Sequence, residues 1–236
     1  MATTDITYAT RDGDEFTGIL AAPDGDGKCP GILFITAIWG IDDSAREIAE
    51  AFADEGFLVS TPDIFWRQHP GPIGDMEIAQ RRYHGYDFDH GLLDMQDLLA
   101  HLRAHPRCNG KIAVFGICFG GRYAHLAAAR WGIDAAASYH GTYIERHLDE
   151  TSRISCPVSF HFGEEDPVVP MDQVRAIQES YAPHSNAEII AHKNAGHNFS
   201  MPYQGQLPPG GRQGAPGRRA EVFPVDVALG SVARPA

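Results

Sequence analysis

The sequence predicts an α/β fold in which a mostly parallel central sheet is covered by helices on both faces. Short apolar runs that suit buried parallel strands alternate with stretches of helical periodicity. Glycine and proline separate these segments at short intervals. At 236 residues the chain is long enough for one domain with a sizeable core.

The expected elements follow one another in a regular order. A hairpin opens the chain, with its turn at residues 11–14, and the first buried strand covers residues 31–36. Helices are expected at residues 43–55, 92–104, 119–131 and 171–181, and further strands at residues 57–60, 111–115, 135–139, 158–162 and 187–191. This alternation is typical of parallel sheets, because parallel neighbours need a crossover connection.

Two segments depart from the alternation. Residues 62–90 are irregular and rich in aromatic and histidine side chains, which fits either a surface loop that buries some rings or a substrate-binding lid. Residues 204–236 contain six glycines, five prolines and four arginines, a linker-like composition. We therefore expect an α/β domain over residues 1–203 and a disordered or atypical tail over residues 204–236.

Composition limits the classes of partner. The net charge of −12 disfavours nucleic acid, and no apolar run is long enough for a membrane span. No secretory signal opens the chain, and its four cysteines form no CxxC pair, so we expect free thiols in a cytoplasmic protein. His101 and His105 are spaced as a metal pair but lack a third ligand, and nucleotide-binding motifs are absent. We expect neither metal nor cofactor, and a small-molecule ligand bound by a monomer or small homo-oligomer.

The strongest local motif is the sequence VFGICFGG, which contains Cys118. It follows a predicted buried strand and precedes a predicted helix, as the nucleophile elbow of α/β hydrolases does. Gly116 and Gly120 flank a turn where side chains would crowd the backbone. The helix N-terminus favours a thiolate at Cys118. A buried structural cysteine is the alternative, but the strand before and the helix after favour a nucleophile.

A nucleophilic thiol needs a base and an acid that orients the base. In α/β hydrolases the chain order is nucleophile, acid, histidine. Asp166 and His197 follow Cys118 in this order, each just after a predicted strand. Glu164 and Glu165 compete with Asp166, and the alternative for His197 is a solvated loop histidine. The oxyanion hole needs two backbone N–H donors, which we assign to Phe119 and to Ile38 in the loop after the first parallel strand.

The ordered set TAIWG, GICFGG, GEEDPVVP and AGHNF resembles the dienelactone hydrolase (carboxymethylenebutenolidase) family over residues 5–203. The resemblance implies an α/β-hydrolase fold with a triad of Cys118, His197 and Asp166. It also implies hydrolysis of an enol-lactone or a related ester through an acyl-enzyme, without a cofactor.

The sequence departs from the family pattern at two positions. Ala37 stands where these enzymes carry a glutamate that takes the thiol proton, so we expect Cys118 to rest as a thiolate paired with protonated His197. Met201 stands where they carry an arginine for a substrate carboxylate, and a more apolar ester or lactone fits it better. The expected substrate-binding residues are Trp39, Arg82, Tyr86 and Met201, with Arg82 as a substitute clamp.

Two other functions remain open from the sequence. A thioesterase could use the same three residues. A non-catalytic binding protein of the same fold would have an unreactive Cys118, and the changed residue 37 and the unusual tail favour that alternative.

Overall fold

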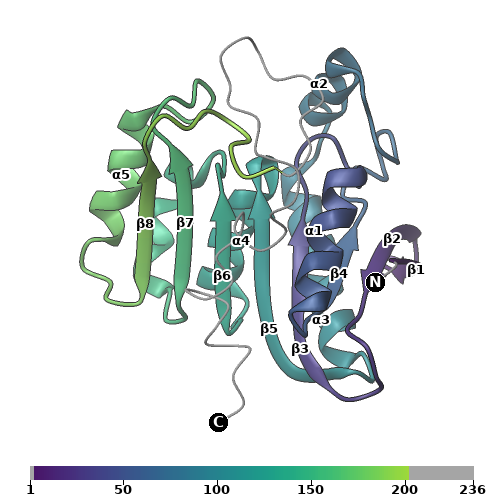
Figure 1. Cartoon of the computed structure of the whole chain (residues 1–236). Coiled ribbons are helices and arrows are strands. Elements are labelled where there is room, and N and C mark those ends of the chain that lie inside the picture. Colours follow the sequence, from purple (N-terminus) through teal and green to yellow (C-terminus); the bar gives the residue numbers. More distant parts are fainter. Residues whose placement is uncertain (1–2, 202–236) are drawn as a thin grey trace.

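A computed structural model describes residues 3–201, which form one eight-stranded sheet with helices on both faces (Figure 1). The strands are β1 (Thr4–Ala9), β2 (Glu15–Ala21), β3 (Cys29–Ile35), β4 (Leu58–Pro62), β5 (Cys108–Ile117), β6 (Ala135–Tyr139), β7 (Val158–Gly163) and β8 (Ala187–His192). Their order across the sheet is β1-β2-β4-β3-β5-β6-β7-β8. The β1–β2 and β2–β4 pairs are antiparallel and the other neighbours are parallel. The predicted mostly parallel α/β sheet is confirmed.

Aspartates begin several of the helices. The helices are α1 (Asp43–Asp54), α2 (Met76–His84), α3 (Phe88–Ala104), α4 (Gly121–Arg130) and α5 (Met171–Tyr181), with 3-10 segments η1 (Cys118–Gly120) and η2 (Ile144–Arg153). Carboxylates of Asp42, Asp75 and Asp87 accept hydrogen bonds from backbone N–H groups in the first turns of α1, α2 and α3, at 2.9–3.0 Å. Each cap satisfies a donor that the helix leaves unpaired.

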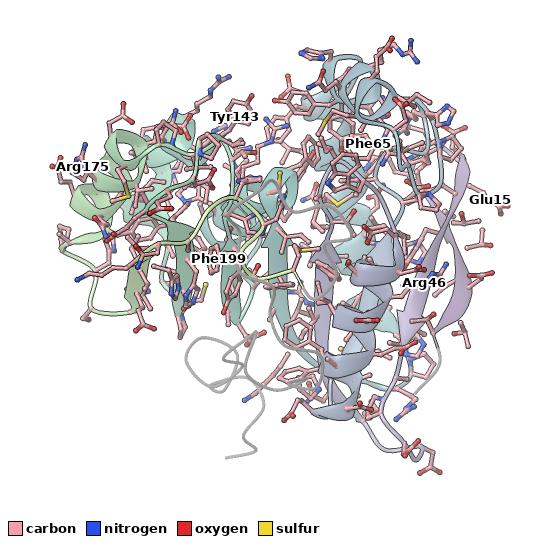
Figure 2. All side chains as sticks on the ribbon, turned by 45° about the horizontal axis from the view of Figure 1, so that its top comes forward. Glu15, Arg46, Phe65, Tyr143, Arg175 and Phe199 are labelled. Atoms are coloured by element: carbon pink, nitrogen blue, oxygen red, sulfur yellow. The ribbon has the colours of Figure 1, made fainter. Side chains whose placement is uncertain are left out.

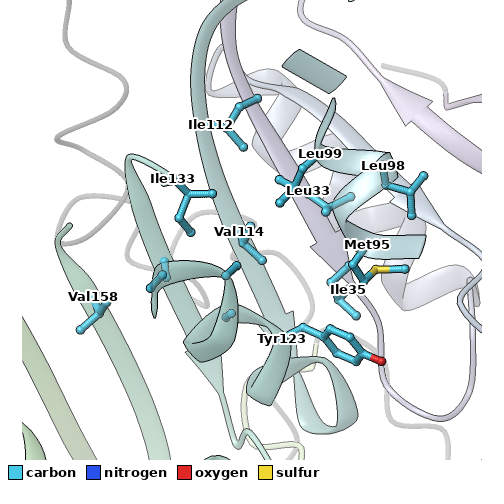
Figure 3. Packing of buried hydrophobic residues seen from close by; sticks show 14 of the residues in the cluster. Leu33, Ile35, Met95, Leu98, Leu99, Ile112, Val114, Tyr123, Ile133 and Val158 are labelled. Carbon is cyan, nitrogen blue, oxygen red and sulfur yellow. The ribbon is translucent and has the colours of Figure 1, made fainter. Parts of the chain in front are cut away.

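The two faces of the sheet pack against different helices. On β3, Ile32 and Phe34 join the cluster formed with α1, whereas Leu33 and Ile35 join the cluster formed with α3, α4 and α5. Figure 3 shows the second cluster, where side chains of α3 and Tyr123 of α4 lie over β3 and β5. These four side chains of β3 are fully buried. The burial of each one stabilises the folded state by roughly 1.5–3 kcal/mol relative to an exposed side chain. The two clusters therefore hold the central strands of the sheet in place from both faces.

The structure contains elements that the apolar pattern did not predict. Helix α2 buries only Ala79 and Arg82, so it lacks the apolar stripe that marks a helix in sequence. The polar segment η2 is held by Glu150, which is buried and pairs with Arg130 and Arg153. Helix α3 begins at Phe88, four residues before the expected start, because Asp87 caps it. Polar contacts and caps, rather than periodicity, set these boundaries.

The segment 62–90 packs through aromatic rings against residues that follow the carboxyl ends of the parallel strands. Phe65 is fully buried, and its ring centroid lies 5.1 Å from that of Phe119, directly after Cys118. Tyr83 stacks on Tyr143 with centroids 6.2 Å apart. In Figure 2, Phe65 lies toward the right of the view and Tyr143 toward the left. This segment, which includes α2, is therefore packed against the protein beside the start of α4.

The expected tail, residues 204–236, lies outside the described residues. Within residues 3–201, no helix has both the length and the apolar character needed to cross a bilayer.

Candidate active site

Four neighbouring parallel strands end at one edge of the sheet, and each is followed by a residue with reactive or titratable chemistry. Cys118 follows β5, His140 follows β6, Asp166 follows β7 and His197 follows β8. Carboxyl ends of parallel strands are where α/β proteins present ligands. The strand order therefore brings together four residues that are up to 79 positions apart in the chain.

The turn that carries Cys118 is sharp and crowded. Cys118 has φ of +49°, a left-handed conformation that costs a non-glycine residue about 1–2 kcal/mol. A Cβ on Gly116 would lie 2.1 Å from the Gly120 carbonyl oxygen, and a Cβ on Gly120 would lie 2.1 Å from that of Ile35. The two glycines therefore allow β5, η1 and β3 to approach closely, and the Cys118 side chain projects from a turn whose backbone is strained.

The loops after β7 and β8 are bound to each other. The Glu165 N–H donates to the Ala195 carbonyl at 2.9 Å, and the Glu164 N–H donates to the His192 carbonyl at 3.0 Å. Glu164 and Glu165 are exposed, whereas the Asp166 side chain is fully buried. Of the three neighbouring acids, the structure turns Asp166 toward His197.

A continuous chain of hydrogen bonds joins Asp166, His197 and Cys118. Asp166 Oδ2 lies 2.7 Å from His197 Nδ1, and His197 Nε2 lies 3.2 Å from Cys118 Sγ. The other oxygen of Asp166 accepts hydrogen bonds from the N–H groups of Val168 and Val169 at 2.8 and 3.2 Å. The carboxylate is thus fixed in place and orients the imidazole, whose second nitrogen faces the sulfur.

Asp166 and Cys118 together determine the charge of His197. Burial opposes a charged ring, but the hydrogen bonds to Asp166 and Cys118 outweigh it and raise the pKa of His197 to about 10. The imidazole therefore holds its proton at neutral pH. This electrostatic setting suits a sulfur that carries negative charge beside an imidazolium.

Arg82 has a different environment from the one expected for a substrate clamp. It is 3% exposed, and its guanidinium donates to the backbone carbonyls of Ile38, His69 and Gly71 at 2.5–3.0 Å. These donors are committed to the protein, so Arg82 is placed to hold the loop after β3. That loop contains Ile38, one of the two residues expected to supply oxyanion donors.

The other three expected substrate-binding residues lie in two settings. Tyr86 accepts a hydrogen bond from the Tyr123 hydroxyl at 2.8 Å and packs edge-on against Phe119 at 5.0 Å, so it supports the elbow from behind. Trp39 and Met201 are half-buried, and both pack against the same apolar cluster as Cys118. Trp39 and Met201 thus lie on the same cluster as the nucleophile, and their contact with a substrate stays a prediction.

The structure adds two residues that sequence reasoning missed. His140 is fully buried, and its ring centroid lies 4.7 Å from that of His197. Arg122 lies one turn after Cys118, and its guanidinium carbon is 3.7 Å from the centre of the Phe88 ring and 5.4 Å from that of Tyr143. Burial lowers the pKa of Arg122, and among residues 3–201 no carboxylate forms an ion pair with it. In the sequence, Arg122 lies four residues after Cys118 and His140 directly follows the predicted strand 135–139, and these positions were the available signals.

The histidine pair considered for a metal in the sequence has other partners. His101 Nε2 contacts the Ala9 carbonyl at 2.9 Å, and His105 Nδ1 accepts from the Arg107 N–H at 3.2 Å. All four cysteines are free.

The eight-stranded sheet, the strained turn after β5, the acid after β7 and the histidine after β8 define an α/β hydrolase. The model of the dienelactone hydrolase family matches residues 16–215, so the chain belongs to that family. It is an enzyme that hydrolyses esters or lactones, and its substrate is a small molecule.

Relatives support this assignment over most of the chain. A carboxymethylenebutenolidase from Pseudomonas putida is 29% identical, with 85% of this chain and 87% of the relative covered. A putative carboxymethylenebutenolidase from Azospirillum brasilense is 28% identical over 93% of this chain and 97% of its own. A putative dienelactone hydrolase from Klebsiella pneumoniae superposes with a TM-score of 0.76 at 22% identity, covering 87% of this chain and 91% of its own. A dienelactone hydrolase-like promiscuous phosphotriesterase from metagenomic libraries has a TM-score of 0.72 at 25% identity and covers 86% of both chains.

Proposed function

We propose that the chain hydrolyses small esters or lactones through a covalent acyl-enzyme on Cys118, with His197 as acid and base and Asp166 as the group that orients it. The observation that carries this proposal is the hydrogen-bond chain from Asp166 to His197 at 2.7 Å and from His197 to Cys118 at 3.2 Å. Nucleophile and base within such reach, with the base oriented by a third group, is the arrangement that covalent catalysis requires.

Acylation starts from a thiolate and an imidazolium. Because the pKa of His197 is raised to about 10, the ring carries a proton at neutral pH and places its positive charge beside the sulfur. Cys118 Sγ attacks the substrate carbonyl carbon, and the carbonyl electron pair moves onto oxygen. When the tetrahedral intermediate collapses, the bond to the leaving oxygen breaks and His197 transfers its proton to that oxygen. In a lactone the leaving group stays attached to the acyl chain.

Deacylation regenerates the resting pair. Neutral His197 takes a proton from water as the water oxygen attacks the thioester carbonyl. Collapse of the second intermediate breaks the C–S bond and releases the carboxylic acid. Cys118 returns to the thiolate and His197 to the imidazolium, so no cofactor enters the balance.

The oxyanion in both steps needs preorganised N–H donors, for which we propose the backbone of Phe119 and Ile38. Phe119 is 1% exposed and is held by the rings of Phe65 and Tyr86. Arg82 binds the Ile38 carbonyl and so restricts the orientation of that loop. We assign Arg82 as a positioning residue for the oxyanion hole instead of a substrate clamp.

Arg122 is a cation that lies close to the Cys118 turn. Its guanidinium lies among the rings of Phe88, Phe119 and Tyr143, at 3.7, 4.8 and 5.4 Å from the ring centres, without a carboxylate partner among residues 3–201. Such a desolvated, unpaired guanidinium is best stabilised by an anion. We therefore propose that preferred esters or lactones carry an acidic group as well as the apolar surface that meets Met201.

The test is pre-steady-state hydrolysis of p-nitrophenyl acetate. The wild-type protein should release a burst of nitrophenol equal to the enzyme concentration, with mass spectrometry locating the acetyl group on Cys118. Cys118→Ala should abolish both, and Cys29→Ala, which removes a buried cysteine away from the site, should preserve them. A burst that survives Cys118→Ala, or an acetyl group found on another residue, would overturn the proposal. Comparing a lactone with an acyl thioester under the same conditions separates lactonase from thioesterase activity.

A further inference from the structure

His140 is a buried imidazole whose hydrogen-bonding capacity is unused. It is 0% exposed, and among residues 3–201 neither ring nitrogen has a hydrogen-bond partner. A buried polar group without a partner costs about 1–3 kcal/mol, so folded proteins rarely keep one without a reason. The proposed hydrolysis does not use His140. Its ring is therefore available to a ligand other than the ester.

Burial favours the neutral form of this ring. Burial and the neighbouring His197 lower the pKa of His140 well below its ordinary value. One ring nitrogen therefore carries a free lone pair at neutral pH. A neutral imidazole with a free lone pair is the form of histidine that binds transition metals.

We propose that Cys118, His140 and His197 form a binding site for a borderline-soft divalent metal ion of the Zn²⁺ class, and that its occupancy reversibly inhibits the hydrolase. One ligand atom from each of the three residues lies within 4.8 Å of the others, and the Sγ–Nε2 contact is 3.2 Å. Tetrahedral zinc with bonds of about 2.0–2.3 Å sets ligand atoms roughly 3.3–3.8 Å apart. The Cys118–His197 pair already has about that spacing, and His140 needs to close by about 1 Å.

The partner of His197 strengthens the proposal. Histidines that bind metals almost always donate their other ring N–H to a carboxylate or carbonyl, which fixes the tautomer and makes the ring a better ligand. His197 has this arrangement, with Nδ1 at 2.7 Å from Asp166 and Nε2 facing the sulfur. The contact that orients a base for catalysis is thus the same one that orients a ligand for zinc.

The backbone holds the other two ligands firmly. Cys118 and His140 both lie in the left-handed region, with φ of +49° and +41°, directly after the neighbouring strands β5 and β6. The Thr142 N–H donates to the Cys118 carbonyl at 3.0 Å, and the His140 N–H donates to the His161 carbonyl at 2.7 Å. The first bond joins the loops after β5 and β6, and the second fixes His140 to strand β7, so the backbone of both ligands is held in place.

The expected consequence of binding follows from the ligand atoms. The metal bonds to the Cys118 thiolate and to the lone pairs of the two imidazoles, and the proton on His197 Nε2 passes to solvent. Water or substrate completes the fourth position, because Cys118 is partly exposed. The inhibition rests on the proposed function, since it removes the nucleophile and the base together. The metal site itself rests only on the geometry.

The test uses cobalt as a spectroscopic substitute for zinc in the full-length, metal-free protein. Co²⁺ should bind with one equivalent and give tetrahedral d–d bands together with a thiolate-to-cobalt charge-transfer band. Cys118→Ser should abolish the charge-transfer band. His140→Phe should weaken Co²⁺ binding and raise the Zn²⁺ concentration for half-inhibition at least about 100-fold, as expected for loss of one of three protein ligands. His84→Gln, at an exposed position on α2, is the matched control and should change neither.

Several results would contradict the proposed metal site. A Zn²⁺ half-inhibition that is equal in wild type and His140→Phe would exclude His140 as a ligand, and a cobalt spectrum without a thiolate band would exclude Cys118. If His140→Phe does not fold, as circular dichroism would show, the same comparison is made with His140→Gln. A cobalt site that depends on His140 in a protein without esterase activity would overturn the proposed function and leave the metal site standing.

Discussion

Acid should destabilise the fold through His125, a buried histidine of α4 that is separate from the site. The ring is 0% exposed, with Nε2 at 2.9 Å from the His147 carbonyl and Nδ1 at 2.7 Å from the Tyr181 hydroxyl. The carbonyl requires the hydrogen on Nε2, so Nδ1 accepts from the tyrosine and the neutral ring is fully satisfied. Burial lowers the pKa of His125 to about 4.

The sign and size of the effect follow from proton linkage. The unfolded chain binds the proton below its ordinary pKa of about 6.5, whereas the folded chain resists it until about pH 4. The stability that comes from the neutral ring is therefore present above about pH 6.5 and is lost as the pH falls toward 4. At about pH 4.5 these pKa values give a loss of ~2.5 kcal/mol in the free energy of unfolding.

Urea unfolding at about pH 7.5 and about pH 4.5 measures this loss. His125→Gln cannot titrate, yet its amide N–H can still reach the His147 carbonyl. The variant should lose ~2.5 kcal/mol less than wild type between the two pH values, whatever its stability at neutral pH. His84→Gln, on the surface, should show the wild-type difference. If His125→Gln and wild type lose the same free energy on acidification, the reasoning about the buried ring is refuted.

Three substitutions near the site have expected outcomes of different kinds. Asp166→Asn should lower kcat by roughly 10³–10⁴-fold, because the amide favours the wrong tautomer of His197; steady-state kinetics on p-nitrophenyl acetate checks this, and a loss below tenfold would contradict it. Arg122→Met should raise KM for esters that carry a carboxylate at least about tenfold more than for neutral esters of the same size, and equal changes for both would remove Arg122 from recognition. Gly120→Ala places a Cβ 2.1 Å from the Ile35 carbonyl oxygen and should cost more than about 3 kcal/mol or prevent folding, as urea unfolding or expression would show.

The sequence was sufficient where the structure depends on local pattern. Alternating apolar strands and amphipathic helices placed the sheet, and the GICFGG turn placed Cys118 at the end of β5, because a strand, two glycines and a helix in succession allow few conformations. The same local reasoning placed the start of α1 at residue 43, where the helix begins.

The sequence was insufficient where a residue is defined by contacts that are distant in the chain. Three neighbouring acids fit the expected spacing, and the choice of Asp166 depends on how the loops after β7 and β8 are bound to each other, which local sequence does not show. His140 is one of twelve histidines, and its importance depends on β6 lying beside β5 in the sheet. Arg82 was expected to face a substrate, but the polar helix α2 that directs it to the Ile38 carbonyl has no apolar stripe.

The most direct test of the central claim is the reactivity of Cys118 toward iodoacetamide near pH 6.5, mapped by mass spectrometry on the native protein. Of the four cysteines, Cys118 is partly exposed and the other three are buried. Because the pKa of His197 is raised to about 10, the ring places a positive charge beside Cys118, and we predict rapid alkylation at Cys118 alone, with parallel loss of esterase activity. His197→Asn should slow this alkylation at least about tenfold. Slow alkylation that accelerates only above about pH 8, or that is unaffected by His197→Asn, would contradict the claim that these residues form an activated nucleophile.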